Sequence, residues 1–280
     1  MSKQIVSSRY TGEQARRELK GLRLCYADVA RLNLQLLPRD DVSFYTKDGD
    51  FIAMFLTDIF SDAEQEERAI AYSHVDGGLR NRPEIFGNLA RQQLIRKDGE
   101  FTDRVGVAPE VLETAGKSAT FGYYRYKNSG PGVPDCRLTA PTLERPDTYS
   151  RILQIEMRVT DIYRTVLPDR YEQQMEYIDS ILPAWKTEGS AFTTSYALEN
   201  QPTAVHVDEF DIPTATGVIT TIGNFTGNEF CMPEFGLAFD LQPSDILFAD
   251  VHRWHGNLPR RSGNRTSQVF FVRKGMHECP

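Results

Sequence analysis

The chain has 280 residues, of which 40% are hydrophobic and 25% are charged, and it carries a formal net charge of -7 at pH 7. This length and hydrophobic content allow a substantial buried core, and the acidic balance argues against a protein that coats nucleic acid through bulk charge. No apolar run approaches the length of a membrane-spanning helix, and the first residues lack a secretory signal. We therefore expect a soluble intracellular protein without membrane contact, cytoplasmic or nuclear, or in the host cytoplasm if it is viral.

The four cysteines are scattered along the chain at Cys25, Cys136, Cys231 and Cys279, and none of them forms a C-x-x-C pair. Neither a zinc ribbon nor a disulfide framework is predicted by this spacing. We expect reduced cysteines.

The N-terminal half is predicted to combine short helices with hairpins. The capping box Thr11-x-x-Gln14 opens a helix that runs through Leu19. Asp-Gly pairs between apolar segments are typical of hairpin turns. The other elements expected here are a strand-like stretch at 22–37, hairpins at 42–56 and 93–102, a helix over 62–72, and a strand at 120–126.

A long loop at 127–146 carries Arg137, and loops of this length beside a catalytic core often contact substrate. Apolar residues then recur at helical spacing from Tyr149 to Val166, which predicts a helix that packs one face on the core and ends before Pro168. A second helix is expected over 170–181.

From Ala191 onward the pattern changes to short segments rich in β-branched and aromatic residues, separated by Gly, Pro, Asn and Asp. Seven or so such strands predict an antiparallel sandwich or barrel. We therefore predict an α+β fold with a double-stranded β-helix (jelly-roll) core backed by helices. The chain is expected to be a single catalytic domain over 1–280, with an N-terminal elaboration at 1–147, backing helices at 148–183 and the jelly-roll core at 188–275.

The candidate metal ligands lie in the stretch from Ala204 to Arg273. His206 and Asp208 are two residues apart, so in a strand their side chains would project to the same side. Two imidazoles and one carboxylate on one face of a metal leave the other positions open for a co-substrate and dioxygen, as in mononuclear non-haem iron oxygenases. We predict that His206, Asp208 and His255 bind iron(II) and form the catalytic centre.

His252 competes with His255 for the third ligand position. No glutamate follows His252, so the His-Glu-x-x-His pattern of zinc proteases is absent. We predict His255, because the turn residues Gly256–Pro259 would leave its side chain at the mouth of a barrel. His252 is then a hydrogen-bonding residue near the site, a substrate contact or a structural histidine.

Arg265 and Ser267 are expected to bind the co-substrate. They are two residues apart and would share one face of a strand. A guanidinium and a hydroxyl match the distal carboxylate of a dicarboxylic keto acid, because charge-assisted hydrogen bonds fix both its position and its length. This pair therefore predicts 2-oxoglutarate.

Four segments of the C-terminal third together resemble the TET/JBP family of DNA-base oxygenases: Thr203-Ala-Val-His-Val-Asp-Glu-Phe-Asp-Ile-Pro, Gly227-Asn-Glu-Phe-Cys-Met-Pro, Asp250-Val-His-Arg-Trp-His-Gly-Asn-Leu-Pro and Arg265-Thr-Ser-Gln-Val-Phe-Phe. The resemblance implies an iron(II)/2-oxoglutarate-dependent dioxygenase that oxidises the 5-methyl group of 5-methylcytosine, or of thymine, in DNA. It also implies the ligand and co-substrate residues given above, and DNA as the macromolecular partner.

The resemblance further implies substrate contacts. Asp211 matches a position that reads the flipped base, where a carboxylate could accept from the cytosine amine, which favours 5-methylcytosine. Phe271 matches a position that stacks on the base. The alternatives are a turn-capping aspartate and a core phenylalanine. Arg125 and Arg137 are expected to reach the co-substrate or a phosphate.

Other functions stay open at this point. A related iron-dependent enzyme could use another donor to modify the 5-methyl group, or could hydroxylate a small molecule or a protein side chain. A non-enzymatic jelly-roll binding module is the third possibility. The sequence gives no indication of the oligomeric state.

Overall fold

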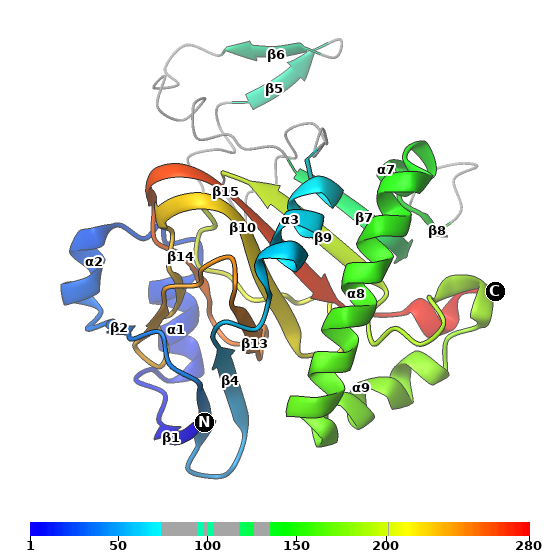
Figure 1. Ribbon diagram of the computed structural model, residues 1–280. Coiled ribbons are helices and arrows are strands. Elements are labelled where there is room, and N and C mark those ends of the chain that lie inside the picture. Colours follow the sequence, from blue (N-terminus) through cyan, green and yellow to red (C-terminus); the bar gives the residue numbers. More distant parts are fainter. Residues whose placement is uncertain (74–93, 98–99, 104–117, 126–134, 201) are drawn as a thin grey trace.

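The computed structural model describes residues 1–73, 94–97, 100–103, 118–125, 135–200 and 202–280. Its centre is a large mixed sheet that faces a smaller sheet (Figure 1). The large sheet has the order β1 (Ser2–Val6), β3 (Val42–Thr46), β4 (Phe51–Leu56), β13 (Ile246–Ala249), β10 (Gly217–Gly227), β15 (Arg260–Phe271), β9 (Thr194–Glu199), β7 (Ser118–Arg125) and β8 (Cys136–Leu138). The small sheet has the order β14 (Gly256–Asn257), β11 (Phe230–Met232), β12 (Leu237–Phe239) and β2 (Gln35–Leu37).

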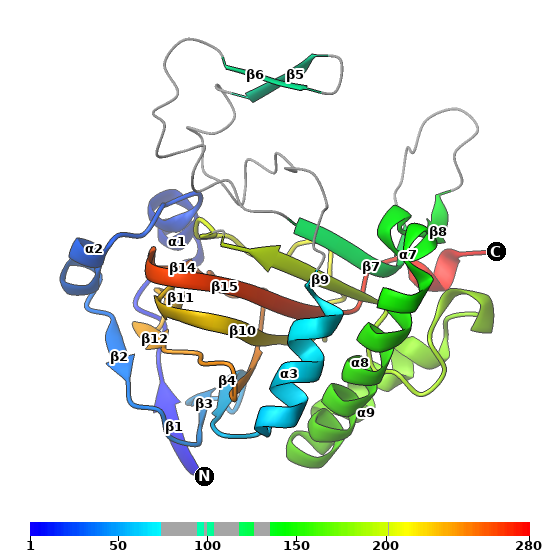
Figure 2. The same ribbon diagram turned by 45° about the horizontal axis from the view of Figure 1, so that its top comes forward.

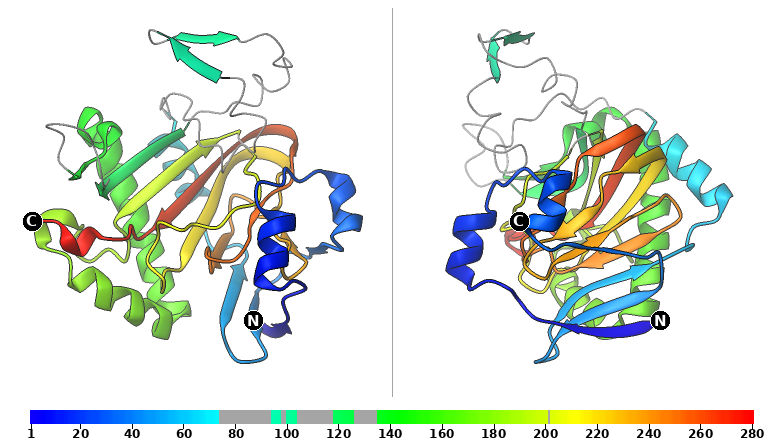
Figure 3. Two further views of the ribbon diagram at one scale, coloured as in Figure 1. Left: turned by 180° about the vertical axis from the view of Figure 1, so that it is seen from behind. Right: turned by 90° about the vertical axis from the view of Figure 1, so that its left-hand side faces the viewer.

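The helices lie on the outer faces of these sheets. On the large sheet, α3 (Asp62–Ala71), α8 (Pro146–Val166) and α9 (Pro168–Asp179) form one layer, with α7 (Ala140–Glu144) preceding α8 (Figure 2). On the opposite side, α1 (Gly12–Leu19) and α2 (Tyr26–Arg31) lie next to the small sheet (Figure 3). Two short 3-10 helices, Pro183–Trp185 and Met276–Glu278, and the separate strand pair β5 (Leu94–Lys97) and β6 (Glu100–Asp103) complete the described elements.

The layers explain the apolar runs in the sequence. In β13, Ile246 and Phe248 pack against the helical layer while Leu247 and Ala249 pack between the two sheets. Because side chains alternate across a strand, a strand covered on both faces needs apolar residues at every position. The predicted double-stranded β-helix core backed by helices is the fold observed.

Strands β10 and β15 pair along most of their length and form the centre of the large sheet. Gly223 and Gly263 have positive φ and sit where this pairing is tightest. A Cβ on Gly223 would lie 2.1 Å from Asn264 O, and one on Gly263 would lie 1.9 Å from Asn224 O. Only glycine permits this approach of the two backbones.

Several predicted elements are confirmed. Thr11 caps α1 through the expected capping box, and the hairpins form as β3–β4 and β5–β6. Helix α3 covers most of the predicted stretch. Helix α8 begins three residues earlier than expected, at Pro146, since proline is favoured in the first turn of a helix.

Two predictions are wrong in part. Residues 22–37 were expected to be strand-like, but they form α2 and only the short strand β2. The backbone N–H of Cys25 donates to the Asp28 carboxylate at 2.8 Å, which stabilises the start of α2. The expected loop at 127–146 contains β8 and α7, while residues 126–134 lie outside the described part of the chain.

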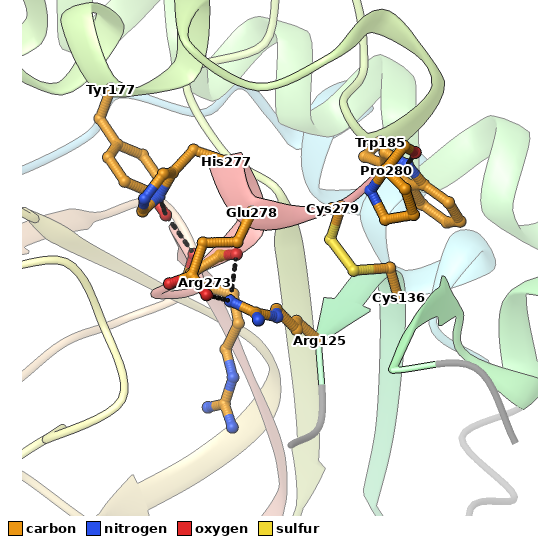
Figure 4. The surroundings of a disulfide bond; sticks show 10 residues. Arg125, Cys136, Tyr177, Trp185, Arg273, His277, Glu278, Cys279 and Pro280 are labelled. Atoms are coloured by element: carbon orange, nitrogen blue, oxygen red, sulfur yellow. Dashed lines mark hydrogen bonds and ion pairs between the residues drawn. A yellow bond between two sulfur atoms is a disulfide. The ribbon is translucent and has the colours of Figure 1, made fainter. Parts of the chain in front are cut away.

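The expectation that all cysteines are reduced is also wrong, because Cys136 and Cys279 form a disulfide (Figure 4). They are 143 residues apart, and the bond ties β8 to the C-terminal segment. Sequence spacing gave no indication of the pair, since only the folded chain brings the two residues together. Cys25 and Cys231 are free. In the described residues, no helix has the length and apolar character required to span a bilayer.

Candidate metal centre and co-substrate pocket

The two predicted histidine ligands face each other across a backbone bridge. His206 N donates to His255 O, and His255 N donates to His206 O, both at 2.9 Å. Their ring centroids are 4.4 Å apart. The bridge joins the loop between β9 and β10 to the segment between β13 and β14. Two distant parts of the sequence are thereby held side by side.

Both imidazoles are oriented by backbone carbonyls. Nδ1 lies 2.8 Å from Ala204 O in His206 and 2.9 Å from Arg253 O in His255. These bonds favour the tautomer in which Nδ1 carries the proton, so that Nε2 presents a lone pair to a metal. Burial and, to a smaller extent, the neighbouring His206 together lower the pKa of His255 to about 4, so this ring is neutral at physiological pH. Phe230 stacks on His255 with ring centroids 5.4 Å apart.

Asp208 completes the cluster. Its carboxylate oxygens lie 3.5 Å from His206 Nε2 and 3.7 Å from His255 Nε2. One ligand atom from each of the three residues lies within 4.8 Å of the others. The Asp208 side chain is 34% exposed, whereas that of His255 is 6% exposed, so the cluster opens to solvent on the carboxylate side. The structure therefore brings together the predicted ligand set.

The local structure around these ligands differs from the one predicted. His206 and Asp208 lie in a loop instead of a strand. Backbone hydrogen bonds replace the strand: His206 pairs with His255, and Asp208 N donates to Val251 O at 2.9 Å. The two side chains converge because both are fixed to the segment that carries the second histidine.

The residues after the second histidine also differ from the prediction. Gly256 and Asn257 form β14, which pairs with β11, in place of the expected turn. A Cβ on Gly256 would lie 3.0 Å from Val205 N, so glycine allows β14 to approach the loop that carries the first histidine. The glycine thus serves close packing, a role that turn propensity does not reveal.

His252, the alternative ligand, lies beside the cluster. Its Nδ1 is 3.3 Å from Asp250 Oδ1, and its Nε2 is 3.5 Å from Asp211 O. Its interaction with Asp250 raises the pKa of His252 above its ordinary value. The geometry supports His255 as the ligand and leaves His252 as a neighbour of the site.

Arg265 lies in β15 and is only 4% exposed. Its Nε has no hydrogen-bond partner among the described residues. Burial lowers the pKa of Arg265 to about 10, and the negative charge of Glu229 opposes this shift. The side chain is still a cation at neutral pH, so it is a buried charge with an unfilled donor. A bound carboxylate would satisfy both needs.

Ser267 and Phe271 follow Arg265 on the same face of β15. Ser267 is buried, and Phe271 is half-buried. Gln268 and Phe270 point to the other face, where Phe270 enters the core beneath the helices. Phe271 belongs to none of the four hydrophobic core clusters of the described residues, which disfavours the alternative of a core phenylalanine.

Asp211 lies three residues beyond Asp208 and is 5% exposed. Its backbone forms a bridge with Arg273, and its N–H lies 3.3 Å from Asp208 O. The structure thus holds Asp211 close to the metal ligand, where the predicted base-reading role requires it. Its role in substrate binding stays a prediction.

Two residues of this region were not identified as site residues from the sequence. Arg273 is 9% exposed, and its guanidinium lies 4.6 Å from the Tyr124 ring centroid and 4.8 Å from that of Phe210. The alternation from Arg265 through Ser267 and Phe271 could have identified Arg273, because it continues the same face. No sequence pattern indicated Phe210.

The structure does not bring the two remaining predicted residues into the ligand cluster. Arg125 Nη1 donates to Gly275 O at 2.8 Å and lies 2.6 Å from Glu278 Oε2 (Figure 4). This guanidinium holds the C-terminal segment, which gives no support for a substrate contact. Arg137 is half-buried in β8, opposite Tyr124 of β7.

The family model Tet_JBP, the oxygenase domain of the 2OGFeDO superfamily, matches residues 120–274, which is more than half of the chain. The chain belongs to this family. The matched range contains all three predicted metal ligands together with Arg265 and Ser267. The predicted TET/JBP membership is confirmed, and iron(II) and 2-oxoglutarate are the cofactors of the superfamily.

Curated relatives match part of this Tet_JBP family member. Thymine dioxygenase JBP1 of Trypanosoma brucei brucei is 28% identical over 170 residues, which is 58% of this chain and 20% of the relative. The bifunctional helicase and thymine dioxygenase JBP2 of Leishmania braziliensis is 25% identical over 224 residues, which is 78% of this chain and 19% of the relative. The chain thus spans about a fifth of the length of these relatives.

A solved structure, NgTET1 in complex with 5mC DNA, resembles the chain with a TM-score of 0.59. The match covers 87% of this chain and 80% of NgTET1, at 17% sequence identity. At this identity the likeness shows the fold, and it agrees with the jelly-roll core described above.

The residues present fit both cofactors. Neutral imidazole nitrogens and a carboxylate oxygen are the donor set that a mononuclear iron(II) oxygenase requires. Arg265, buried and with an unfilled donor, fits the distal carboxylate of 2-oxoglutarate, with Ser267 beside it on β15.

Proposed function

We propose that the chain is an iron(II)/2-oxoglutarate-dependent dioxygenase that oxidises the 5-methyl group of 5-methylcytosine or thymine in DNA. The observation that carries the proposal is the cluster of His206, Asp208 and His255 within the range matched by the family model. The names of the curated relatives, thymine dioxygenases, support a 5-methylpyrimidine as the substrate.

When bound, the iron and 2-oxoglutarate supply oxygen activation coupled to oxidative decarboxylation of the co-substrate. The task of His206, Asp208 and His255 is to hold the metal from one side and leave the other side accessible. The carbonyls bonded to the two Nδ1 atoms keep both rings in the orientation that this requires.

Arg265 and Ser267 bind and orient the co-substrate. The buried guanidinium supplies a charge-assisted hydrogen bond to the distal carboxylate in a region with little water, where such a bond is strongest. Ser267, two residues further along the same strand face, provides a hydroxyl donor.

The substrate base is positioned by residues next to the ligands. A base in duplex DNA must leave the stack to present its methyl group, and its edge and face then need partners. We assign Asp211 to the base edge and Phe271 to the base face. Asp211 favours cytosine because a carboxylate accepts a hydrogen bond from the exocyclic amine.

The test is mass spectrometry of nucleosides from DNA incubated with the protein, iron(II), 2-oxoglutarate and oxygen. Three matched duplexes should be compared, one with 5-methylcytosine, one with thymine as its only 5-methylpyrimidine, and one with uracil in place of thymine and no methylated cytosine. We expect one added oxygen atom in the 5-methylcytosine nucleoside, with equimolar succinate.

Each other outcome has a defined meaning. Oxidation of thymidine alone would support the proposed oxidation of a 5-methyl group in DNA, but it would overturn the assignment of Asp211 as the residue that selects cytosine. Succinate formation that does not respond to any DNA would overturn DNA as the substrate. His206→Ala should abolish the product, while His277→Ala is the matched control, because His277 is an exposed histidine bonded to Tyr177.

A further inference from the structure

The loop that carries Asp208 presents a phenylalanine to solvent. Phe210 is 58% exposed and lies two residues beyond the ligand, next to the buried Asp211. A single exposed phenylalanine carries little information by itself. Its contacts determine whether this ring is part of the site.

The backbone at Phe210 is fixed to the chain that follows β15. Lys274 N donates to Phe210 O at 2.9 Å, and Ile212 N donates to Val272 O at 3.2 Å. The backbone bridge between Asp211 and Arg273 belongs to the same pairing of the two segments. The exposed ring therefore projects from a loop that is hydrogen-bonded in place.

The ring is also supported by a buried cation. The Arg273 guanidinium carbon lies 4.8 Å from the Phe210 ring centroid, and its other neighbour is Tyr124, with a ring centroid 4.6 Å away. Nη2 donates to the Tyr124 hydroxyl at 3.1 Å. The side chain points away from the ion pair between Arg125 and Glu278 (Figure 4). Tyr124, Arg273 and Phe210 thus form a stack that begins in the protein and ends at solvent.

We propose that Phe210 stacks on a nucleic-acid base next to the pyrimidine that is oxidised. This inference rests on the proposed function. An extruded pyrimidine leaves a gap in the base stack, and the neighbouring base then lacks one stacking partner. An aromatic ring at the mouth of the site can replace that partner for any base, because every base has a π face. The exposed Lys274 beside it adds a positive charge near the DNA backbone.

The location favours a nucleic-acid base over a protein partner. The exposed ring lies two residues from Asp208, the most exposed of the three ligands, whereas a protein interface would need a wider apolar surface. The exposed residues next to it, Glu209 in sequence and Lys274 across the backbone pairing, are charged, so the ring does not continue there into an apolar patch.

The experiment compares Phe210→Ala, Phe210→Leu and Phe210→Trp with the wild-type chain. A methylated duplex with 2-aminopurine next to the 5-methylcytosine reports stacking through its fluorescence. Binding is measured without oxygen, with manganese(II) in place of iron(II), and KM and kcat are measured with iron(II) and oxygen. Leu143→Ala is the matched control, because Leu143 is a 64% exposed leucine on α7.

We expect the alanine and leucine variants to raise the Kd and KM for DNA by about 5- to 150-fold, with a smaller change in kcat, since base stacking on an aromatic ring has this strength. The tryptophan variant should bind as the wild type does. The 2-aminopurine fluorescence of the complex should be lower with phenylalanine or tryptophan at position 210 than with leucine or alanine, because an aromatic ring restores the stacking that extrusion of the neighbouring base removes. The Kd for 2-oxoglutarate and the melting temperature should not change.

Leucine or alanine variants that bind the duplex within twofold of the wild type would overturn the inference. So would a 2-aminopurine signal that is the same with leucine as with phenylalanine. A wild-type chain that neither binds nor oxidises methylated DNA would overturn the proposed function as well. The two failures are distinguishable, because only the first leaves the wild-type chain active on DNA.

Discussion

Replacing Arg265 by methionine tests the co-substrate pocket most directly. The change keeps the approximate length of the side chain and removes its charge and donors. In the wild-type protein the guanidinium is 4% exposed and has an unfilled Nε donor among the described residues. Its partner in the complex is therefore expected to be the 2-oxoglutarate carboxylate and not water.

The size of the effect follows from this burial. A hydrogen bond to a charged group contributes about 1.5–3 kcal/mol, and a guanidinium can make two such bonds with a carboxylate. Their loss amounts to about 3–6 kcal/mol, so the Kd for 2-oxoglutarate should rise at least about 100-fold. Without the ligand the variant should not be less stable than the wild type. Burial lowers the pKa of Arg265 to about 10, which reflects an unfavourable buried charge that methionine would remove.

The assay is isothermal titration of 2-oxoglutarate into the manganese(II) form without oxygen, together with urea denaturation of the metal-free protein. Arg164→Met is the matched control, since Arg164 is 61% exposed on α8 and pairs with Asp161. A Kd within about threefold of the wild type in Arg265→Met would refute the assignment of this residue to the co-substrate.

Three further predictions concern the metal, a buried carboxyl and the disulfide. Asp208→Ala should weaken manganese(II) binding, measured by titration, by more than about 100-fold. Loss of a residue that only supports a metal ligand weakens binding by up to about 100-fold, and loss of a ligand should cost more. Burial raises the pKa of Glu156 from 4.5 to about 7. Because the pKa is higher in the folded state than in the unfolded state, the free energy of unfolding should fall by up to about 3 kcal/mol as the pH rises from about 4.5 to about 7. Glu156→Gln should remove this loss of stability, as measured by urea denaturation at several pH values. Replacing Cys136 and Cys279 together by serine should lower the free energy of unfolding by about 2–4 kcal/mol, measured in the same way.

Each of these has a control and a contrary result. For the metal, Asp161→Ala, at an exposed aspartate of α8, should bind manganese(II) normally, and tight binding by Asp208→Ala would contradict the ligand assignment. For Glu156, equal pH dependence in the glutamine variant and the wild type would show that another group titrates. For the disulfide, Cys25→Ser should be neutral because Cys25 is an exposed free thiol, and a double serine variant as stable as the wild type would contradict the prediction.

The sequence predicted the parts of the site that depend on spacing within one strand or on residue chemistry. Arg265 and Ser267 share a face because they are two residues apart in β15. His206, Asp208 and His255 were identifiable because two imidazoles and a carboxylate form a recognisable donor set. These features need no knowledge of how distant segments meet.

The features that were missed depend on contacts between distant segments. The disulfide joins residues 143 positions apart, and the stack of Tyr124, Arg273 and Phe210 combines a loop, β7 and the chain after β15. Gly256 was interpreted as a turn residue because its own neighbours favour a turn, whereas its packing against Val205 requires the folded chain. Local patterns contain no information on such pairs.

The bond between Cys136 and Cys279 closes residues 136–279 into a covalent ring. The 135 residues before it form an open arm. The ring contains the metal ligands, the co-substrate residues and helices α8 and α9. The arm supplies β1, β3 and β4 at the outer edge of the large sheet, β2 of the small sheet, and β7, which lies between β9 and β8. Under mild denaturant the edge strands β1, β3 and β4 can therefore separate while the ring stays closed, and opening should proceed in two steps. A single proteolytic cut within the ring would leave its two pieces joined until the disulfide is reduced.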